Sequence, residues 1–246
     1  MGDILEALAA EAPLSAADIA ERIDEPLSSV YRLLRTMRER QYVASPRRGE
    51  FQLGMRVFEL GAAVSTRFSL RDAARPAMER LRAETDGTVL LFIRRGDRAV
   101  CIDRVDGRWV RLEIVDVGES LPLHTGASPR LLLAQLDDTE IDDYLDGARL
   151  EQHTQRSPAT PREVRRLVEQ IRHDGYAVSD QDLVLGVASI AAPVRDQSGA
   201  AIAGMSYSGL AETLLGGGQR ERSIELVSRA ADEASRQLGW TGGKDG

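Results

Sequence analysis

The 246-residue sequence predicts an α+β protein: an N-terminal winged helix-turn-helix, a linker helix, and a larger C-terminal domain with an antiparallel sheet flanked by helices. Three short helical patterns followed by a strand–turn–strand pattern within 53 residues predict the first domain. Helices and strands that come in blocks predict the α+β character of the second. We expect residues 1–53 to form the winged helix-turn-helix domain, residues 54–69 the linker helix, and residues 70–240 the second domain.

The first two helices of the N-terminal domain are short. Apolar residues at helical spacing predict a first helix that ends before Pro13. Ser15 can cap the amides that begin the second helix, and Asp18, three residues later, can return a bond to the Ser15 backbone. This capping box predicts a second helix that runs to about Arg22.

The third helix, expected from Pro26 to Arg40, has an apolar stripe and an opposite polar face. The stripe follows the i, i+3, i+4, i+7 spacing of a buried helix side, at Val30, Leu33, Leu34 and Met37. The opposite face and its flanks hold Ser28, Ser29, Tyr31, Arg32 and Arg35. Small hydroxyls allow a helix to approach base edges, and guanidinium groups bind phosphate or guanine. These residues are typical of a recognition helix that enters a DNA groove.

A hairpin after the third helix completes the winged motif. Pro46 and Gly49 bracket its turn, and Arg47 and Arg48 lie at the tip, where a wing would meet the sugar-phosphate backbone. From Ser28 to Arg48, six arginines and one glutamate give a local charge of +5, so the rest of this −7 chain sums to −12. This asymmetry indicates a basic contact surface on an acidic body, although a solvated basic helix is the alternative.

The second domain is expected to begin with a helix from Leu70 to about Asp86. The strands expected after it lie at 88–94, 99–105, 109–115, 187–194 and 200–208. The further helices are expected at 128–136, 138–145, 161–174 and 219–238. Thr160 and Glu163 form a capping box before the third of these helices, and Gly175 follows its end.

Composition excludes several classes of protein. No stretch approaches the roughly 18 consecutive apolar residues of a membrane-spanning helix, and the N-terminus lacks the charge pattern of a secretory signal, so we expect a cytoplasmic protein with no membrane contact. Cys101 is the only cysteine, which excludes an intrachain disulfide. There is no nucleophile elbow, no metal-spaced histidine pair and no glycine-rich phosphate loop. We therefore expect neither an enzyme nor a bound metal or cofactor.

Five segments, in order and with consistent spacing, carry a family resemblance. They are 26–34 (Pro-Leu-Ser-Ser-Val-Tyr-Arg-Leu-Leu), 51–61 with two Leu-Gly pairs, 118–125 (Gly-Glu-Ser-Leu-Pro-Leu-His-Thr), 175–180 and 186–194. The sequence resembles the IclR family of bacterial transcriptional regulators over nearly its whole length. This resemblance implies a GAF-like second domain that binds a small effector.

The resemblance also implies a set of effector contacts: Ala127, Ser128, Ser179, Val187, Ser189, Ser206 and Ser208. Ser189, Ser206 and Ser208 stand out by themselves, because they interrupt apolar strands. Hydroxyls that face a cavity walled by Leu123 and Val187 would suit a small, weakly polar or mono-anionic molecule, such as a carboxylic or aromatic compound. The alternative is that small residues let a helix pack closely on the sheet.

The chain departs from the family pattern after His124. Pro129 replaces the usual glycine and Arg130 the usual lysine, and we expect the proline to stiffen the start of its helix. For His124 we favour a structural role over effector contact. For Cys101, which lies in a predicted strand, we favour packing over redox sensing.

The sequence therefore predicts a transcriptional regulator that binds double-stranded operator DNA as a homodimer or tetramer, with binding modulated by a small organic effector. One alternative is a ligand-independent regulator whose second domain only oligomerises. The other is an enzyme acting on a small acid, which the missing catalytic groups disfavour.

Overall fold

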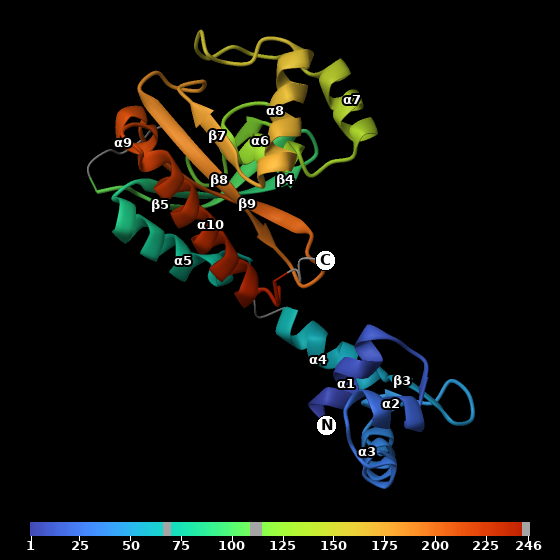
Figure 1. The fold of residues 1–246 in the computed structure, drawn as a ribbon. Coiled ribbons are helices and arrows are strands. Elements are labelled where there is room, and N and C mark those ends of the chain that lie inside the picture. Colours follow the sequence, from blue (N-terminus) through green and yellow to red (C-terminus); the bar gives the residue numbers. More distant parts are fainter. Residues whose placement is uncertain (66–69, 109–114, 243–246) are drawn as a thin grey trace. The chain divides into compact units, whose positions relative to one another are not determined.

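The computed structural model describes residues 1–65, 70–108 and 115–242. The chain folds into two compact units, Met1–Ser69 and Leu70–Gly246 (Figure 1). Each unit has its own core of buried apolar side chains. The two units are therefore described separately.

The first unit packs α1, α2 and α3 against a small sheet and ends with a fourth helix, α4. Its elements are α1 (Gly2–Ala10), β1 (Leu14–Ser15), α2 (Ala16–Arg22), α3 (Leu27–Glu39), β2 (Val43–Ala44), β3 (Glu50–Leu53) and α4 (Met55–Ser65). The strands are ordered β1-β3-β2, and β2 and β3 form the predicted wing hairpin. The predicted capping box is present, since Ser15 Oγ accepts from the Asp18 amide at 3.2 Å. Pro26 was expected at the first position of the third helix. It instead occupies the N-cap position just before α3, where its ψ of 132° is not helical.

Gly54, the residue before α4, packs closely against the backbone that follows α3. The Gly54 amide donates to the Tyr42 carbonyl at 2.8 Å. A Cβ at Gly54 would lie 2.1 Å from the carbonyl oxygen of Gln41, so no larger residue fits without moving the backbone. This close approach fixes where the linker helix begins relative to the wing.

The second unit is a six-stranded antiparallel sheet covered on both faces by helices. Its strands, in the order β6-β5-β4-β9-β8-β7, are β4 (Thr88–Arg95), β5 (Arg98–Val105), β6 (Ser120–Pro122), β7 (Ala177–Asp180), β8 (Val187–Arg195) and β9 (Ala201–Leu210). Its helices are α5 (Leu70–Thr85), α6 (Ala127–Leu133), α7 (Asp138–Gly147), α8 (Pro161–Asp174), α9 (Ala211–Leu215) and α10 (Gln219–Gln237).

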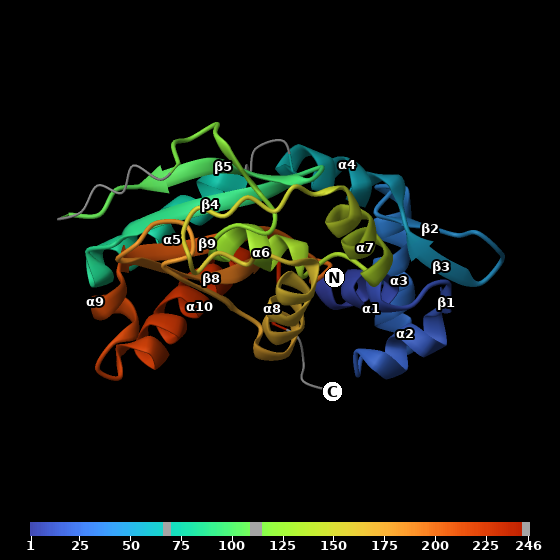
Figure 2. The same ribbon diagram turned by 90° about the horizontal axis from the view of Figure 1, so that it is seen from above.

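Two separate apolar layers hold this sheet. Helices α5 and α10 cover one face, and α6 packs on the other with α8 and α7 outside it (Figures 1 and 2). Alternation along the strands sends Ile190 and Met205 to the α5/α10 layer and Leu90 and Ala191 to the α6 layer. The α6 layer is the one that contains the candidate ligand cavity.

Several short elements were not predicted from the sequence: β1, β6, β7 and α9. Each has five residues or fewer, too short to carry a periodic pattern. The strand expected at 109–115 falls on residues 109–114, outside the described part of the chain, and Val115 is not in a strand.

Candidate functional site

Helix α3 turns its predicted polar face to solvent. Val30, Leu34 and Met37 are buried in the core of the first unit, which fixes the opposite side outward. All five predicted contact residues of this helix lie on that outward side and its flanks, and only Ser29 is half-buried: Ser28, Ser29, Tyr31, Arg32 and Arg35. Arg47 and Arg48 are exposed in the turn between the wing strands. The first unit thus presents a recognition-helix face and a basic wing tip.

The N-terminus of α3 has no side-chain cap. The Ser29 amide donates to the Pro26 carbonyl at 2.8 Å, and the positive end of the helix dipole lies at this first turn. Arg35 Nε lies 3.3 Å from Glu39 Oε1, with both side chains mostly exposed. An exposed pair of this kind is weak, so a phosphate can replace the glutamate.

In the second unit, the strand register aligns hydroxyl residues in one row across the sheet. Ser179 on β7 lies opposite Ser189 on β8, and Ser189 lies opposite Ser208 on β9. Ser208 in turn lies opposite Thr88 on β4. Ser206 lies on the same face of β9 as Ser208, two residues away. Four of the predicted effector contacts are therefore neighbours.

These serines line a small, partly open cavity of about 30 Å³, which we call the serine cavity. Its wall includes Pro129, Ser179, Val187, Ser189, Ser206 and Ser208, completed by apolar side chains. That volume is room for about one water molecule, so an organic ligand can enter only if the side chains of the wall move apart. Leu123, Ala127 and Ser128 are buried but are not among the residues that line it.

Ser128 instead packs α6 onto the sheet. Its hydroxyl donates to the Gly204 carbonyl at 3.4 Å. A Cβ at Gly204 would lie 3.3 Å from Ser128 Cβ, so the glycine allows this close approach.

The hydroxyls in the serine cavity differ in their partners. Ser179 Oγ donates to Asp182 Oδ1. In the part of the chain that the structure describes, the hydroxyls of Ser189, Ser206 and Ser208 make no hydrogen bond. Hydroxyls that line a pocket without a protein partner are available to a ligand or to water. They are the best candidates for ligand contacts.

A buried ion pair supports this wall of the cavity. Arg130, 1% exposed, contacts Asp182 Oδ2 through Nη1 and donates from Nη2 to the Val178 carbonyl at 2.9 Å. Sequence reasoning noted Arg130 only as a departure from the family pattern and missed Asp182. The available signal was that arginine occurs in a helix whose other residues are all apolar or small, since a buried arginine needs an acid.

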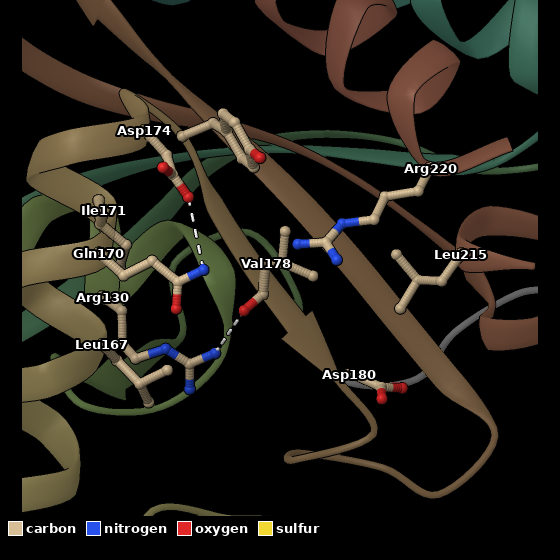
Figure 3. Close-up of a pocket in the computed structure, with 10 residues that line it drawn as sticks. Arg130, Leu167, Gln170, Ile171, Asp174, Val178, Asp180, Leu215 and Arg220 are labelled. Atoms are coloured by element: carbon tan, nitrogen blue, oxygen red, sulfur yellow. Dashed lines mark hydrogen bonds between the residues drawn. The ribbon is translucent and has the colours of Figure 1, made fainter. Parts of the chain in front are cut away.

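A second, larger cavity of about 320 Å³ lies at the open edge of β7. Figure 3 shows Arg130 and Arg220 on opposite sides of Val178. Asp174 and Asp180 also line this second cavity. The guanidinium of Arg130 therefore faces this second cavity. Two arginines and two aspartates give it no net charge among these residues.

His124 and Cys101 occupy buried positions. The His124 amide donates to Tyr144 Oη at 3.1 Å, and His124 Nδ1 lies 2.7 Å from the same oxygen, so the tyrosine hydroxyl holds both the backbone and the ring of His124. Burial, and then the nearby charges of His153 and Arg130, lower the pKa of His124. Burial raises the pKa of the Cys101 thiol to about 11, which fits a packing role.

Within residues 1–65, 70–108 and 115–242, no group of histidine, cysteine or acidic side chains could hold a metal ion. No helix of those segments is long and apolar enough to cross a membrane.

Two family models match this chain. The model described as the IclR helix-turn-helix domain matches residues 2–46. The model described as the bacterial transcriptional regulator IclR C-terminal domain matches residues 62–236.

Individual relatives match over nearly the full length. The HTH-type transcriptional regulator KdgR of Escherichia coli is 30% identical over 239 residues, which cover 96% of this chain and 90% of KdgR. The crystal structure of Thermotoga maritima IclR is 28% identical, covers 97% of both chains, and has a TM-score of 0.66. An IclR homologue from Microbacterium hydrocarbonoxydans, complexed with 4-hydroxybenzoate, is 23% identical with a TM-score of 0.64 and covers 96% of both chains. This last likeness concerns the fold alone.

Proposed function

This chain belongs to the IclR family of bacterial transcriptional regulators, and from that premise we propose that a small organic molecule in the serine cavity modulates its affinity for operator DNA. The predicted α+β fold, with its helix-turn-helix and GAF-like C-terminal domain, is confirmed by the family match. The protein is a DNA-binding transcriptional regulator and not an enzyme. The proposal concerns what controls it.

We place operator contact on the outward face of α3 and the wing tip. Arg32 and Arg35 would bind phosphate or guanine, while Ser28 and Ser29 would lie nearest the groove. The salt dependence of binding to the upstream region of its own gene tests this placement. Absence of any salt-dependent binding there would overturn it.

We propose that the operator is bound by a homodimer, and that two dimers can form a tetramer. Helix α4 supports this, because Met55 and Phe58 are 67% and 71% exposed in a single copy. Large apolar side chains that are exposed together on one helix indicate a surface that packs against another apolar surface. Light scattering on Phe58→Glu should then give a smaller particle than the wild-type protein. Equal masses would contradict the assignment of α4.

The single observation that carries the effector proposal is that the hydroxyls of Ser189, Ser206 and Ser208 line one cavity and have no partner among the described residues. Carboxylic and aromatic compounds belong in the screen, including the 4-hydroxybenzoate held by the Microbacterium homologue. A ligand that binds the folded protein raises its unfolding temperature as its concentration exceeds its dissociation constant.

Ser208→Ala and Ser223→Ala make a matched pair for this screen. Both serines are buried, but Ser223 donates to the Leu214 carbonyl and lies outside the cavity. A ligand of the serine cavity loses its stabilising effect in the first variant and keeps it in the second. If no compound stabilises the protein or changes its DNA affinity, the ligand-independent alternative is favoured.

A further inference from the structure

We propose that the second cavity, at the open edge of β7, is a further ligand site that takes a small zwitterion, such as a free amino acid with an apolar side chain. This inference goes beyond the proposed function, because none of the residues that line the second cavity lines the serine cavity. Four features of the second cavity carry it: its volume, a buried arginine with an unused donor, two helix ends of opposite polarity, and the arrangement of its charges.

The second cavity has room for a small organic molecule. Its volume of about 320 Å³ lies at the lower end of the range of about 300–1,000 Å³ that is usual for ligand pockets, and it is partly open to solvent. Alternation along β7 separates it from the serine cavity, since Val178 and Asp180 line the second cavity and Ser179 between them lines the first. The two cavities can therefore be filled by different ligands.

A buried arginine on this wall keeps an unused hydrogen-bond donor. Arg130 is 1% exposed, and Figure 3 shows its guanidinium on the wall of the cavity beside Val178. Its Nη1 contacts Asp182 and its Nη2 donates to the Val178 carbonyl, but its Nε has no hydrogen-bond partner among the described residues. A buried N–H without an acceptor is costly, so Arg130 marks a point where an acceptor from a ligand would be stabilising. A carboxylate is the strongest such acceptor for a guanidinium.

Two helix ends of opposite polarity contribute to the wall. Arg220 is the second residue of α10, a helix of nineteen residues without a side-chain cap, and Asp174 is the last residue of α8. The N-terminus of a helix is the positive end of its dipole and the C-terminus the negative end. Arg172 and Glu221, which carry the opposite signs in the same two turns, do not line the cavity. The α10 end of the cavity therefore favours an anionic group and the α8 end a cationic one.

The four charged side chains of the wall alternate in sign around the centre of the cavity in Figure 3. Asp180 is already paired with Arg156 at 2.8 Å. Asp174 accepts a long bond of 3.4 Å from the Gln170 amide, and Arg220 has no partner among the described residues. One anion and one cation of the wall are therefore left to a ligand.

A zwitterion matches these two groups. Its carboxylate would lie near Arg220 and the first turn of α10, and its ammonium group near Asp174. Leu167, Ile171 and Leu215 offer apolar surface to a hydrocarbon side chain. A carboxylate without an ammonium group would be repelled by the two aspartates, and an ammonium group alone would be repelled by the two arginines. We therefore expect the ligand to need both of its charges.

Compounds that share one hydrocarbon skeleton but differ in charge test the inference on the full-length protein. L-Leucine carries both charges, 4-methylpentanoate only the carboxylate, and 3-methylbutylamine only the ammonium group. L-Phenylalanine, 3-phenylpropanoate and 2-phenylethylamine form the same series with a larger side chain. Thermal shift and calorimetry are measured near neutral pH. We expect at least one amino acid to bind and stabilise the protein, and its two singly charged relatives to bind about tenfold more weakly or less, the loss typical of one charged hydrogen bond.

Variants show whether that binding involves the second cavity. Arg220→Gln and Asp174→Asn should each weaken the amino acid by about tenfold or more. The matched controls are Arg222→Gln, an exposed arginine of the same helix, and Asp146→Asn, an exposed aspartate near the end of α7; neither lines the cavity. Both controls, and Ser208→Ala in the serine cavity, should leave the affinity unchanged. Arg220 is exposed, so its substitution should not alter the unfolding temperature of the free protein.

Three results would overturn the inference. If 4-methylpentanoate or 3-phenylpropanoate binds as tightly as its amino acid, and Arg220→Gln weakens it, the ligand is a simple anion and not a zwitterion. If Ser208→Ala abolishes binding and Arg220→Gln does not, the amino acid occupies the serine cavity, so the inference fails and the proposed function stands. If neither amino acid binds, the inference fails alone, because the screen for ligands of the serine cavity does not depend on it.

Discussion

Arg130 and Asp182 form an ion pair whose side chains are only 2% and 7% exposed. The pair joins α6 to the loop that follows β7. Asp182 Oδ1 also accepts a hydrogen bond from the hydroxyl of Ser179, which lines the serine cavity. A structural ion pair therefore fixes the orientation of a ligand-facing hydroxyl.

Removing the acid of this pair should strongly destabilise the second unit. Asp182→Ala leaves a buried guanidinium without its counter-charge, which typically costs about 3–5 kcal/mol. Asp180→Ala is the matched control, because it breaks the half-exposed Arg156–Asp180 pair two residues away, a pair worth under about 1 kcal/mol. Urea unfolding measures both. Equal losses would mean that the buried pair contributes no more than a surface one.

His124 should make stability depend on pH below neutrality. Because burial lowers its pKa in the folded protein, the unfolded chain binds this proton first as the pH falls. Above the pKa of a histidine in the unfolded chain, about 6.5, His124 makes its whole contribution to the free energy of unfolding. This contribution is lost as the pH falls from that value toward the pKa of His124 in the folded protein. The slope for one proton is at most about 1.4 kcal/mol per pH unit.

His124→Asn should flatten this part of the pH profile of unfolding. His173→Gln, at the exposed end of α8, is the control and should leave the profile as it is. An unchanged profile in His124→Asn would show that another group carries the pH dependence.

Cys101 should resist thiol reagents in the folded protein. Its side chain is buried and burial raises its pKa to about 11, so little thiolate exists near pH 8. Labelling with a disulfide reagent should proceed only as fast as the protein unfolds, and quickly in urea. Rapid labelling without urea would revive the redox-sensing alternative.

Arg32→Ala should weaken operator binding and also its dependence on salt. Loss of one phosphate contact lowers the slope of log affinity against log salt by about 0.9. Arg162→Ala, an exposed arginine on α8 in the other unit, removes the same charge and should leave the slope unchanged. Equal effects of the two variants would point to overall charge instead of a contact.

The helices with strong end signals were predictable from sequence. Helix α8 has the bounds that were predicted, because Thr160 and Glu163 form their capping box and Gly175 ends the helix at φ of 78°. The polar face of α3 was equally readable, since one 3.6-residue pattern determines it. Such local signals need no knowledge of the tertiary fold.

The serine cavity was only partly readable. Serines that interrupt apolar strands indicated Ser189, Ser206 and Ser208, but their alignment with Ser179 depends on the β7-β8-β9 order, which no local pattern encodes. Which residues of α6 face the cavity depends on the rotation of that helix about its axis on the sheet. Ser128 contacts Gly204 and does not line the cavity. Asp182 lies in a loop without periodicity, so its pairing with Arg130 required the fold.

The affinity for operator DNA with and without the stabilising ligand tests the central claim most directly. Fluorescence anisotropy of labelled operator should give dissociation constants that differ by about fivefold or more when the ligand is saturating. The difference should shrink in Ser208→Ala and persist in Ser223→Ala. Identical dissociation constants with and without a ligand that occupies the serine cavity would contradict the account.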